Sequence, residues 1–174
     1  MIQRIRIDDR LLHGQVAFSW KSKLDFNAIV IASDAAANDP MRKQVMKMCC
    51  PEGVKLAVRT VEDAAELLKN PRLESMRVFV VCPDPETVKR LLDLIPDRPL
   101  VNLGGMASGE GKRLFSRMVY VSDEDVAALD DIDAMGIEIE VQEVPSTTAQ
   151  SYKHLREKFY SRHLKSGINP VCRK

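Results

Sequence analysis

Residues 1–20, MIQRIRIDDRLLHGQVAFSW, combine a strand pattern, a polar loop and the opening of a helix. Ile2, Ile5 and Ile7 are spaced as in a strand that enters a core, and residues 15–20 are typical of a helix start. Between them stand five residues that suit a chemical site: Asp8, Asp9, Arg10, His13 and Gly14. We expect them on a strand-to-helix loop. Such loops lie at the carboxyl ends of parallel strands, where α/β proteins bind their ligands.

The rest of the chain repeats the alternation of strand and helix. We expect strands over 26–33, 54–58, 76–81, 117–122 and 137–141. Helices are expected to begin after the N-cap residues Asp39, Thr60, Asp84 and Ser122, and a last helix to cover 147–164. This order predicts an α/β fold: a doubly wound, mostly parallel open sheet of about six or seven strands with helices on both faces. Ile and Glu alternate in 137–141, which indicates a strand with one solvent-facing side near an edge of the sheet. The sheet is allowed one antiparallel strand at an edge.

Two further features of the pattern concern elements away from the first loop. Gly136 is expected to end the helix after Ser122. In the helix after Asp39, Met41, Val45 and Met48 recur at helical spacing, and we expect them to face inward as core.

Length and composition indicate one domain over residues 1–174. Apolar residues make up 45% and charged residues 29% of the chain, the proportions of an ordinary globular domain. No apolar run approaches the roughly 20 residues that a bilayer span requires. The N-terminus is charged where a signal peptide would be apolar. We therefore expect a cytoplasmic protein whose membrane association, if any, comes through a partner.

Cysteines and charge argue against metal, redox and nucleic-acid roles. The four cysteines form no CxxC pair and have no histidine at ligand spacing; they are Cys49, Cys50, Cys82 and Cys172. Residues 121–145 carry nine acids and no Lys or Arg, whereas the segment from Ser146 carries seven basic residues against one acid. We interpret these as helix-end acids and a solvated terminal helix, with a docking patch as the alternative. No basic stripe with interleaved aromatic residues is present.

The loop after the first strand has the parts of an anion cradle that contains a nucleophile. A neutral imidazole such as that of His13 is a nucleophile near neutral pH. Arg10 offers a planar donor fork suited to phosphate. The backbone N–H groups at Gly14 and Gln15 open a helix, so they lack intrahelical partners, and Gly14 lets an anion approach closely.

The role of the two carboxylates stays open at this stage. Asp8 or Asp9 would accept a hydrogen bond from one ring nitrogen of His13 and fix its tautomer. Alternatively, the carboxylates would pair with Arg4, Arg6 or Arg10 and hold the shape of the loop. An isolated His-Gly pair is more often a plain turn, but cation, carboxylates, glycine and helix start coincide here, which favours a site.

Residues 5–20, IRIDDRLLHGQVAFSW, resemble the signature of the IIB component of the mannose/fructose/sorbose family of the bacterial phosphoenolpyruvate:sugar phosphotransferase system (PTS). Two further segments are similar to that family: SDAAANDPMRKQVMKMCCPEGVK (33–55) and VNLGGM (101–106). The likeness covers most of the chain. It departs at Leu12, where isoleucine is frequent, and at Ser33-Asp34, where Asn-Asp is common.

The resemblance implies a single EIIB type-4 domain that acts as a protein-histidine–sugar phosphotransferase without metal or cofactor. His13 would accept a phosphoryl group at Nδ1 from a phosphohistidine of the IIA protein and pass it to the sugar held by membrane components IIC and IID. Arg10 would hold the phosphoryl oxygens, and Asp8 or Asp9 would support the loop.

The resemblance also assigns supporting roles to residues outside the first loop. Gly104 and Gly105 would line the neighbouring loop across the crevice. Apart from the resemblance, Asp34 follows the second strand and is therefore expected close to the first loop, where it would support the site. His154 and His163 are not expected to act chemically, and Trp20 is expected to pack or to contact a partner. The alternative function is a non-catalytic module that binds a phosphorylated metabolite. The sugar and the number of subunits, including a homo-oligomer, stay open.

Overall fold

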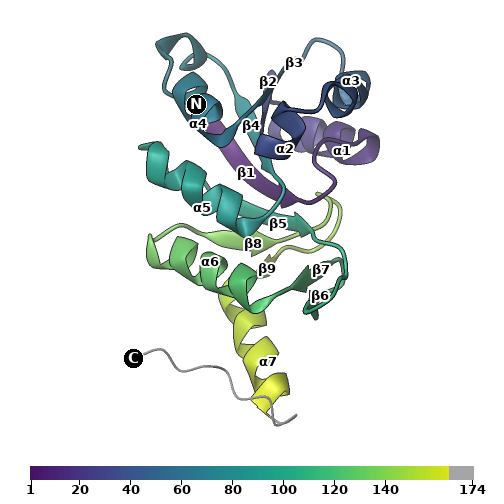
Figure 1. Cartoon of the computed structure of the whole chain (residues 1–174), viewed down its shortest axis with the longest axis vertical. Helices are drawn as coiled ribbons and strands as arrows, with labels where there is room; N and C mark the ends of the chain where they lie inside the picture. The colour runs from purple at the N-terminus through teal and green to yellow at the C-terminus, as the bar shows by residue number, and fades with distance from the viewer. Residues whose placement is uncertain (165–174) are drawn as a thin grey trace.

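The computed structural model describes residues 1–164 as a seven-stranded sheet covered by helices, with a separate two-stranded hairpin (Figure 1). The main sheet has the order β3-β2-β4-β1-β5-β8-β9. Its strands are β1 (Ile2–Asp8), β2 (Ala28–Ala32), β3 (Lys55–Arg59), β4 (Val78–Cys82), β5 (Val101–Gly105), β8 (Ile139–Val141) and β9 (Gln150–Ser151). The hairpin consists of β6 (Arg113–Ser116) and β7 (Val119–Val121).

Helices connect these strands. They are α1 (Gly14–Leu24), α2 (Asp34–Ala37), α3 (Pro40–Cys49), α4 (Val61–Leu68), α5 (Pro85–Leu94), α6 (Asp123–Ala134) and α7 (Tyr152–Leu164), with a short 3-10 helix η1 (Pro71–Leu73). All strand pairs of the main sheet are parallel except β8–β9, which is antiparallel at one edge. The predicted fold class, including the antiparallel edge strand, is confirmed.

Alternating strand residues bury two separate cores. In β2, Ile29 and Ile31 face the core under α1, α2 and α3, whereas Ala28, Val30 and Ala32 face the larger core under α4 to α7. The central strands are buried along their whole length because helices cover both faces. β1 lies in the middle of the sheet, between β4 and β5.

The predicted helix starts are confirmed by their caps. Asp39, Thr60, Asp84 and Ser122 each accept a hydrogen bond from a backbone N–H of the first helical turn. Gly136 follows α6 with φ 78°, the left-handed conformation that glycine adopts without strain.

The expectation that Met41, Val45 and Met48 face the core is wrong. Their exposed fractions are 77%, 54% and 78%, and Met46 is the buried residue of α3. Helical spacing shows that the three residues share a face, but it does not decide which way that face points. Here Met46 contacts the core and the opposite side of the helix carries the apolar stripe.

Three expected segments have different boundaries or partners. The strand expected over 117–122 is β7, which pairs with β6 in the small hairpin rather than within the main sheet. The last helix begins at Tyr152, because Gln150–Ser151 first pair with β8. The VNLGGM segment is strand β5 up to Gly105, so its glycines are buried in the sheet and not in a loop.

The charged segments near the end of the chain pair with each other. Arg156 binds the carboxylate of Asp130, and the Tyr152 hydroxyl donates to the same carboxylate at 2.7 Å. Lys153 lies 3.4 Å from Asp133. The acids of α6 and the bases of α7 therefore join two helices of the same chain, which neither of our two interpretations anticipated.

The cysteines that the structure describes are free thiols. Cys82 is fully buried in β4, and burial raises the pKa of its thiol far above the ordinary range. Such a thiol packs as a small apolar side chain. Cys172 lies outside the described residues.

Candidate functional site

The loop between β1 and α1 lies at the carboxyl end of the central strand and is tied to the end of β5. Asp9 connects the two segments: its N–H donates to the carbonyl of Gly105 at 3.1 Å, and its carboxylate accepts from the N–H of Ala107 at 2.6 Å. A turn follows, in which the Leu11 N–H donates to the Asp8 carbonyl at 2.9 Å. Leu11 has φ 58°, which costs a non-glycine residue about 1–3 kcal/mol.

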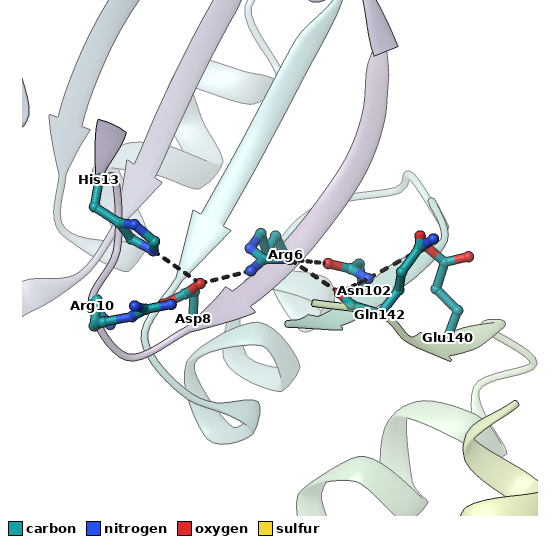
Figure 2. A network of polar contacts seen from close by, with 7 residues as sticks. All are labelled: Arg6, Asp8, Arg10, His13, Asn102, Glu140 and Gln142. Carbon is teal, nitrogen blue, oxygen red and sulfur yellow. Dashed lines mark hydrogen bonds and ion pairs between the residues drawn. The ribbon is translucent and has the colours of Figure 1, made fainter. Parts of the chain in front are cut away.

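His13 stands at the junction of this loop with α1. It is the N-cap residue of the helix and its side chain caps no backbone N–H. The imidazole is 26% exposed, and its Nε2 lies 3.4 Å from Oδ2 of Asp8, whose side chain is fully buried (Figure 2). The ring is thus held from the protein side while part of it faces solvent.

The charge of Asp8 determines which ring nitrogen is free. Burial, the largest single influence, would raise the pKa of Asp8, but the hydrogen bond from His13 and the charge of Arg6 together lower it below the ordinary value. An ionised carboxylate can only accept hydrogen bonds, so Nε2 must carry the proton. The lone pair of a neutral His13 is therefore on Nδ1, the nitrogen that the family resemblance implies.

Arg6 is the buried counter-charge of Asp8. Its guanidinium has no exposed surface and donates to Oδ2 of Asp8 at 2.8 Å and to Oδ1 of Asn102 at 2.6 Å (Figure 2). Burial lowers the pKa of Arg6, and the charge of Asp8 opposes this effect. The charges of Arg6 and Asp8 therefore stabilise each other in the buried site.

Asn102 extends this network from β1 across β5 to the strand beyond. Its Nδ2 donates to the carbonyl of Gln142 at 3.1 Å and lies 3.4 Å from Glu140, which also pairs with Arg4. On the other side, the guanidinium carbons of Arg4 and Arg6 lie 5.2 and 5.6 Å from the centre of the Trp20 ring. A continuous set of contacts thus fixes the buried charges behind His13.

Gly104 leaves the space in which the Arg6 guanidinium lies. A Cβ on Gly104 would be 2.0 Å from Cζ of Arg6, whereas one on Gly105 would meet Oδ2 of Asp8 at an ordinary 3.5 Å. The expectation that both glycines line a loop across a crevice is therefore wrong in its geometry. Gly104 instead makes room for the buried cation that holds Asp8.

Arg10, Gly14 and Gln15 belong to the same loop and helix start as His13. The Arg10 side chain is 54% exposed, with Nε 3.5 Å from Oδ1 of Asp8, and its backbone N–H donates to the same oxygen at 3.2 Å. A Cβ on Gly14 would meet no atom within 4 Å, so the space at the helix start is open. The first N–H groups of α1 have no intrahelical partner, because the first such bond runs from Ala17 to His13.

Asp34 is not brought to His13 by any described contact. Its carboxylate accepts from the N–H of Val61 and from Arg90, both at 3.0 Å. These bonds lower the pKa of Asp34, the bond from Val61 most. Asp34 thus stabilises the start of α4, and its expected support of the His13 site is not observed.

The other residues that the sequence analysis discussed are Trp20, His154, Gln15 and His163. Trp20 is fully buried and stacks on Phe79, with 6.1 Å between the ring centres. Of the two predicted roles, packing and contact with a partner, the structure shows packing. His154 is exposed on α7. The side chains of Gln15 and His163 lie outside the described part of the structure.

Sequence reasoning named Arg6 only as one of three possible partners of the loop carboxylates, and it missed Asn102. A signal was present in β1: Arg4, Arg6 and Asp8 alternate, so they share one face of a strand. A central strand buries both faces, and buried charges require partners. The partner strand β5 could not be identified from spacing alone.

Two absences can be stated for residues 1–164. No helix in this range is long and apolar enough to cross a membrane. No group of three His, Cys, Asp or Glu side chains is arranged there to hold a metal ion.

Comparison with known proteins adds independent information. The family model "PTS system sorbose subfamily IIB component" matches residues 2–165. The "PTS system mannose-specific EIIAB component" of Escherichia coli (strain K12) is 37% identical over 139 residues, which is 80% of this chain but 43% of that protein. The chain thus corresponds to less than half of that relative.

A shorter relative and a solved structure match over nearly their whole length. The "N-acetylgalactosamine-specific phosphotransferase enzyme IIB component 1" of the same organism is 33% identical over 80% of this chain and 89% of its own. The crystal structure of the IIBSor domain of the sorbose permease from Klebsiella pneumoniae superposes with a TM-score of 0.87 at 28% identity. It covers 91% of this chain and 97% of that domain.

Proposed function

Because the chain belongs to the sorbose subfamily of PTS IIB components, which are sugar-specific phosphotransferase components, we propose that it is a phosphocarrier that uses His13. The imidazole receives a phosphoryl group from the phosphohistidine of a IIA protein and delivers it to a sugar held by the membrane components IIC and IID. The protein works in the cytoplasm, at the inner face of the membrane where those partners lie.

One observation carries the proposal: the buried Asp8 carboxylate lies against Nε2 of His13. An ionised Asp8 keeps the proton on Nε2 and so leaves the lone pair of a neutral His13 on Nδ1. In this tautomer Nδ1 carries no proton, so a neutral His13 could not use that nitrogen to donate a hydrogen bond to a metabolite.

The transfer step needs alignment more than new chemical groups. Nδ1 of His13 attacks the phosphorus atom in line, the P–N bond of the donor phosphohistidine breaks, and the donor imidazole keeps the electron pair. Arg10 and the first N–H groups of α1 stabilise the charge on the phosphoryl oxygens. Asp8 stabilises the positive charge that develops on the His13 ring. In the second transfer a sugar hydroxyl oxygen attacks the same phosphorus in line, the P–N bond to His13 breaks and Nδ1 keeps the electron pair, while the hydroxyl proton passes to a base of the component that holds the sugar.

The test is labelling of the whole chain by the upstream carriers. After incubation with labelled phosphoenolpyruvate, the two general carriers and a cognate IIA protein, we expect about one label per chain. The label should be labile in acid and stable in alkali, as a phosphohistidine is. If no label enters while the IIA protein is itself phosphorylated, the proposal is wrong.

A second candidate, a module that binds a phosphorylated metabolite, predicts a different outcome. It requires saturable binding of a sugar phosphate without covalent label, and binding that largely survives replacement of His13 by asparagine. Calorimetry with a sugar phosphate distinguishes this function from the carrier function.

Arg10 provides a further prediction. Arg10→Gln should slow label transfer from phosphorylated IIA about a hundredfold, because a charged donor to the phosphoryl oxygens is lost. The half-exposed side chain contributes little to the fold, so the thermal midpoint should hardly change. The control is Arg72→Gln, an exposed arginine of η1. Quench-flow labelling measures both, and equal rates for the two variants would exclude Arg10 as a phosphoryl ligand.

A further inference from the structure

A groove lies between α3 and the edge strand β3, and none of its lining residues belongs to the His13 site described above. Its volume is about 440 Å³. The walls and floor are formed by Lys43, Lys47, Cys50, Pro51, Val54, Leu56, Val58 and Arg59. Four of these residues are apolar (Pro51, Val54, Leu56 and Val58) and three are cationic (Lys43, Lys47 and Arg59).

The strand that borders the groove has a free edge. β3 is the last strand of the sheet and pairs only with β2. The Lys55 N–H and the Arg59 carbonyl bond toward the β2 side, to Asn27 and Ser33. Because main-chain groups alternate along a strand, those of Leu56 and Val58 point to the free edge. The Val58 carbonyl accepts a hydrogen bond from Nη1 of Arg59 at 2.9 Å, which leaves the two N–H groups and the Leu56 carbonyl for an added strand. Such an edge is a template for an added strand.

The charges at the groove are unbalanced. Lys43, Lys47 and Arg59 form no ion pair within residues 1–164, and no acidic residue lines the groove. Residues 40–59 contain five Lys or Arg and a single acid, Glu52, in a chain whose net charge is only +1. The local excess of positive charge selects an anionic occupant.

Charge also excludes two occupants that would otherwise fit. Residues 165–174 of this chain contain Lys165, Arg173 and Lys174 and no Asp or Glu, so this segment would be repelled. A second copy that paired edge to edge would bring Lys55 and Arg59 of the two chains together, which like charges oppose. A flat lipid surface contacts convex surfaces and leaves a groove unfilled.

We propose that an extended acidic segment of a different protein binds in this groove as an additional strand beside β3. Its backbone bonds to the N–H groups of Leu56 and Val58 and to the carbonyl of Leu56, and one apolar side chain contacts Val54. Its carboxylates pair with Lys43, Lys47 and Arg59. The exposed stripe of Met41, Val45 and Met48 on the other flank of α3 offers the same partner an adaptable apolar contact.

Fluorescence anisotropy on the full chain tests the proposal with a short labelled peptide in which glutamate and valine alternate. We expect saturable binding that Lys43→Glu/Lys47→Glu weakens about tenfold or more, since two charge pairs become repulsive. A peptide with proline at alternate positions keeps its charge but loses N–H donors, so it should also bind about tenfold more weakly. Amide chemical shifts of Leu56 and Val58 should move on binding.

The control variant Arg72→Glu/Lys158→Glu reverses two exposed charges on η1 and α7 and should bind the peptide within about twofold of wild type. Three results would overturn the proposal: no saturable binding, equal binding of the proline peptide, or equal weakening in the control variant. Binding to vesicles of anionic lipid that requires Lys43 and Lys47, without binding of the peptide, would also overturn it. Label transfer to His13 is measured separately, so failure here leaves the phosphocarrier function untouched.

Discussion

His13→Asn is expected to abolish phosphoryl transfer while the fold survives. The variant should take up no label from phosphorylated IIA, because an amide nitrogen has no lone pair available for attack. Stability should stay within about 1 kcal/mol of wild type, since asparagine is a favoured N-cap and the replaced side chain caps nothing in α1. Labelling and urea unfolding of the same preparation measure the two effects.

The matched control for this prediction is His154→Asn, on the exposed side of α7. It should accept label at the wild-type rate. Residual acid-labile label in His13→Asn would place the phosphoryl group on another residue and would contradict the assignment. Loss of the fold in that variant would contradict the inference that the His13 side chain contributes little to the stability of α1.

Gly104→Ala is expected to destabilise the protein by about 3–5 kcal/mol, the cost of breaking a buried ion pair. The new Cβ would lie 2.0 Å from Cζ of Arg6. Leu103 pairs with both β1 and β8 and Gly105 pairs with β1, so the backbone on either side of Gly104 is held. The Arg6 guanidinium must therefore leave Asp8 and Asn102, which strands a fully buried carboxylate. Urea unfolding measures the loss.

Gly105→Ala is the neighbouring control, because its Cβ would make only ordinary contacts with Asp8. It should change stability by less than about 1 kcal/mol. In an Arg6→Met background the added cost of Gly104→Ala should shrink, since the clash with the guanidinium is gone. Equal stability of the two alanine variants, or full additivity with Arg6→Met, would show that Gly104 does not make room for Arg6.

The two aspartates of the loop have different tasks. Asp8 is fully buried, balances Arg6 and orients His13. Asp9 binds the backbone at Gly105 and Ala107 and joins the loop to β5. One residue thus sets the chemistry of the imidazole and the next sets the position of the loop.

Local patterns in the sequence predicted much of the fold. The caps at Thr60, Asp84 and Ser122 depend on hydrogen bonds within four residues, so spacing alone identifies them. The hairpin of β6 and β7 was not recognised, because short strands outside the main sheet have no distinctive period. The prediction for the apolar stripe of α3 was wrong because periodicity shows that residues share one face of a helix but does not show whether that face points to the core or to solvent.

By itself the sequence determined the order of strands and helices, the family, and the loop on which His13 and Arg10 follow the first strand. These properties depend on neighbours along the chain. Only the tertiary structure decided that Asp8 rather than Asp9 contacts His13, that Arg6 is buried beneath Gly104, and that Asp34 contacts Arg90. Each of these depends on side chains that β1, β5 and α5 bring together from distant positions, and spacing along the chain carries no information about such contacts.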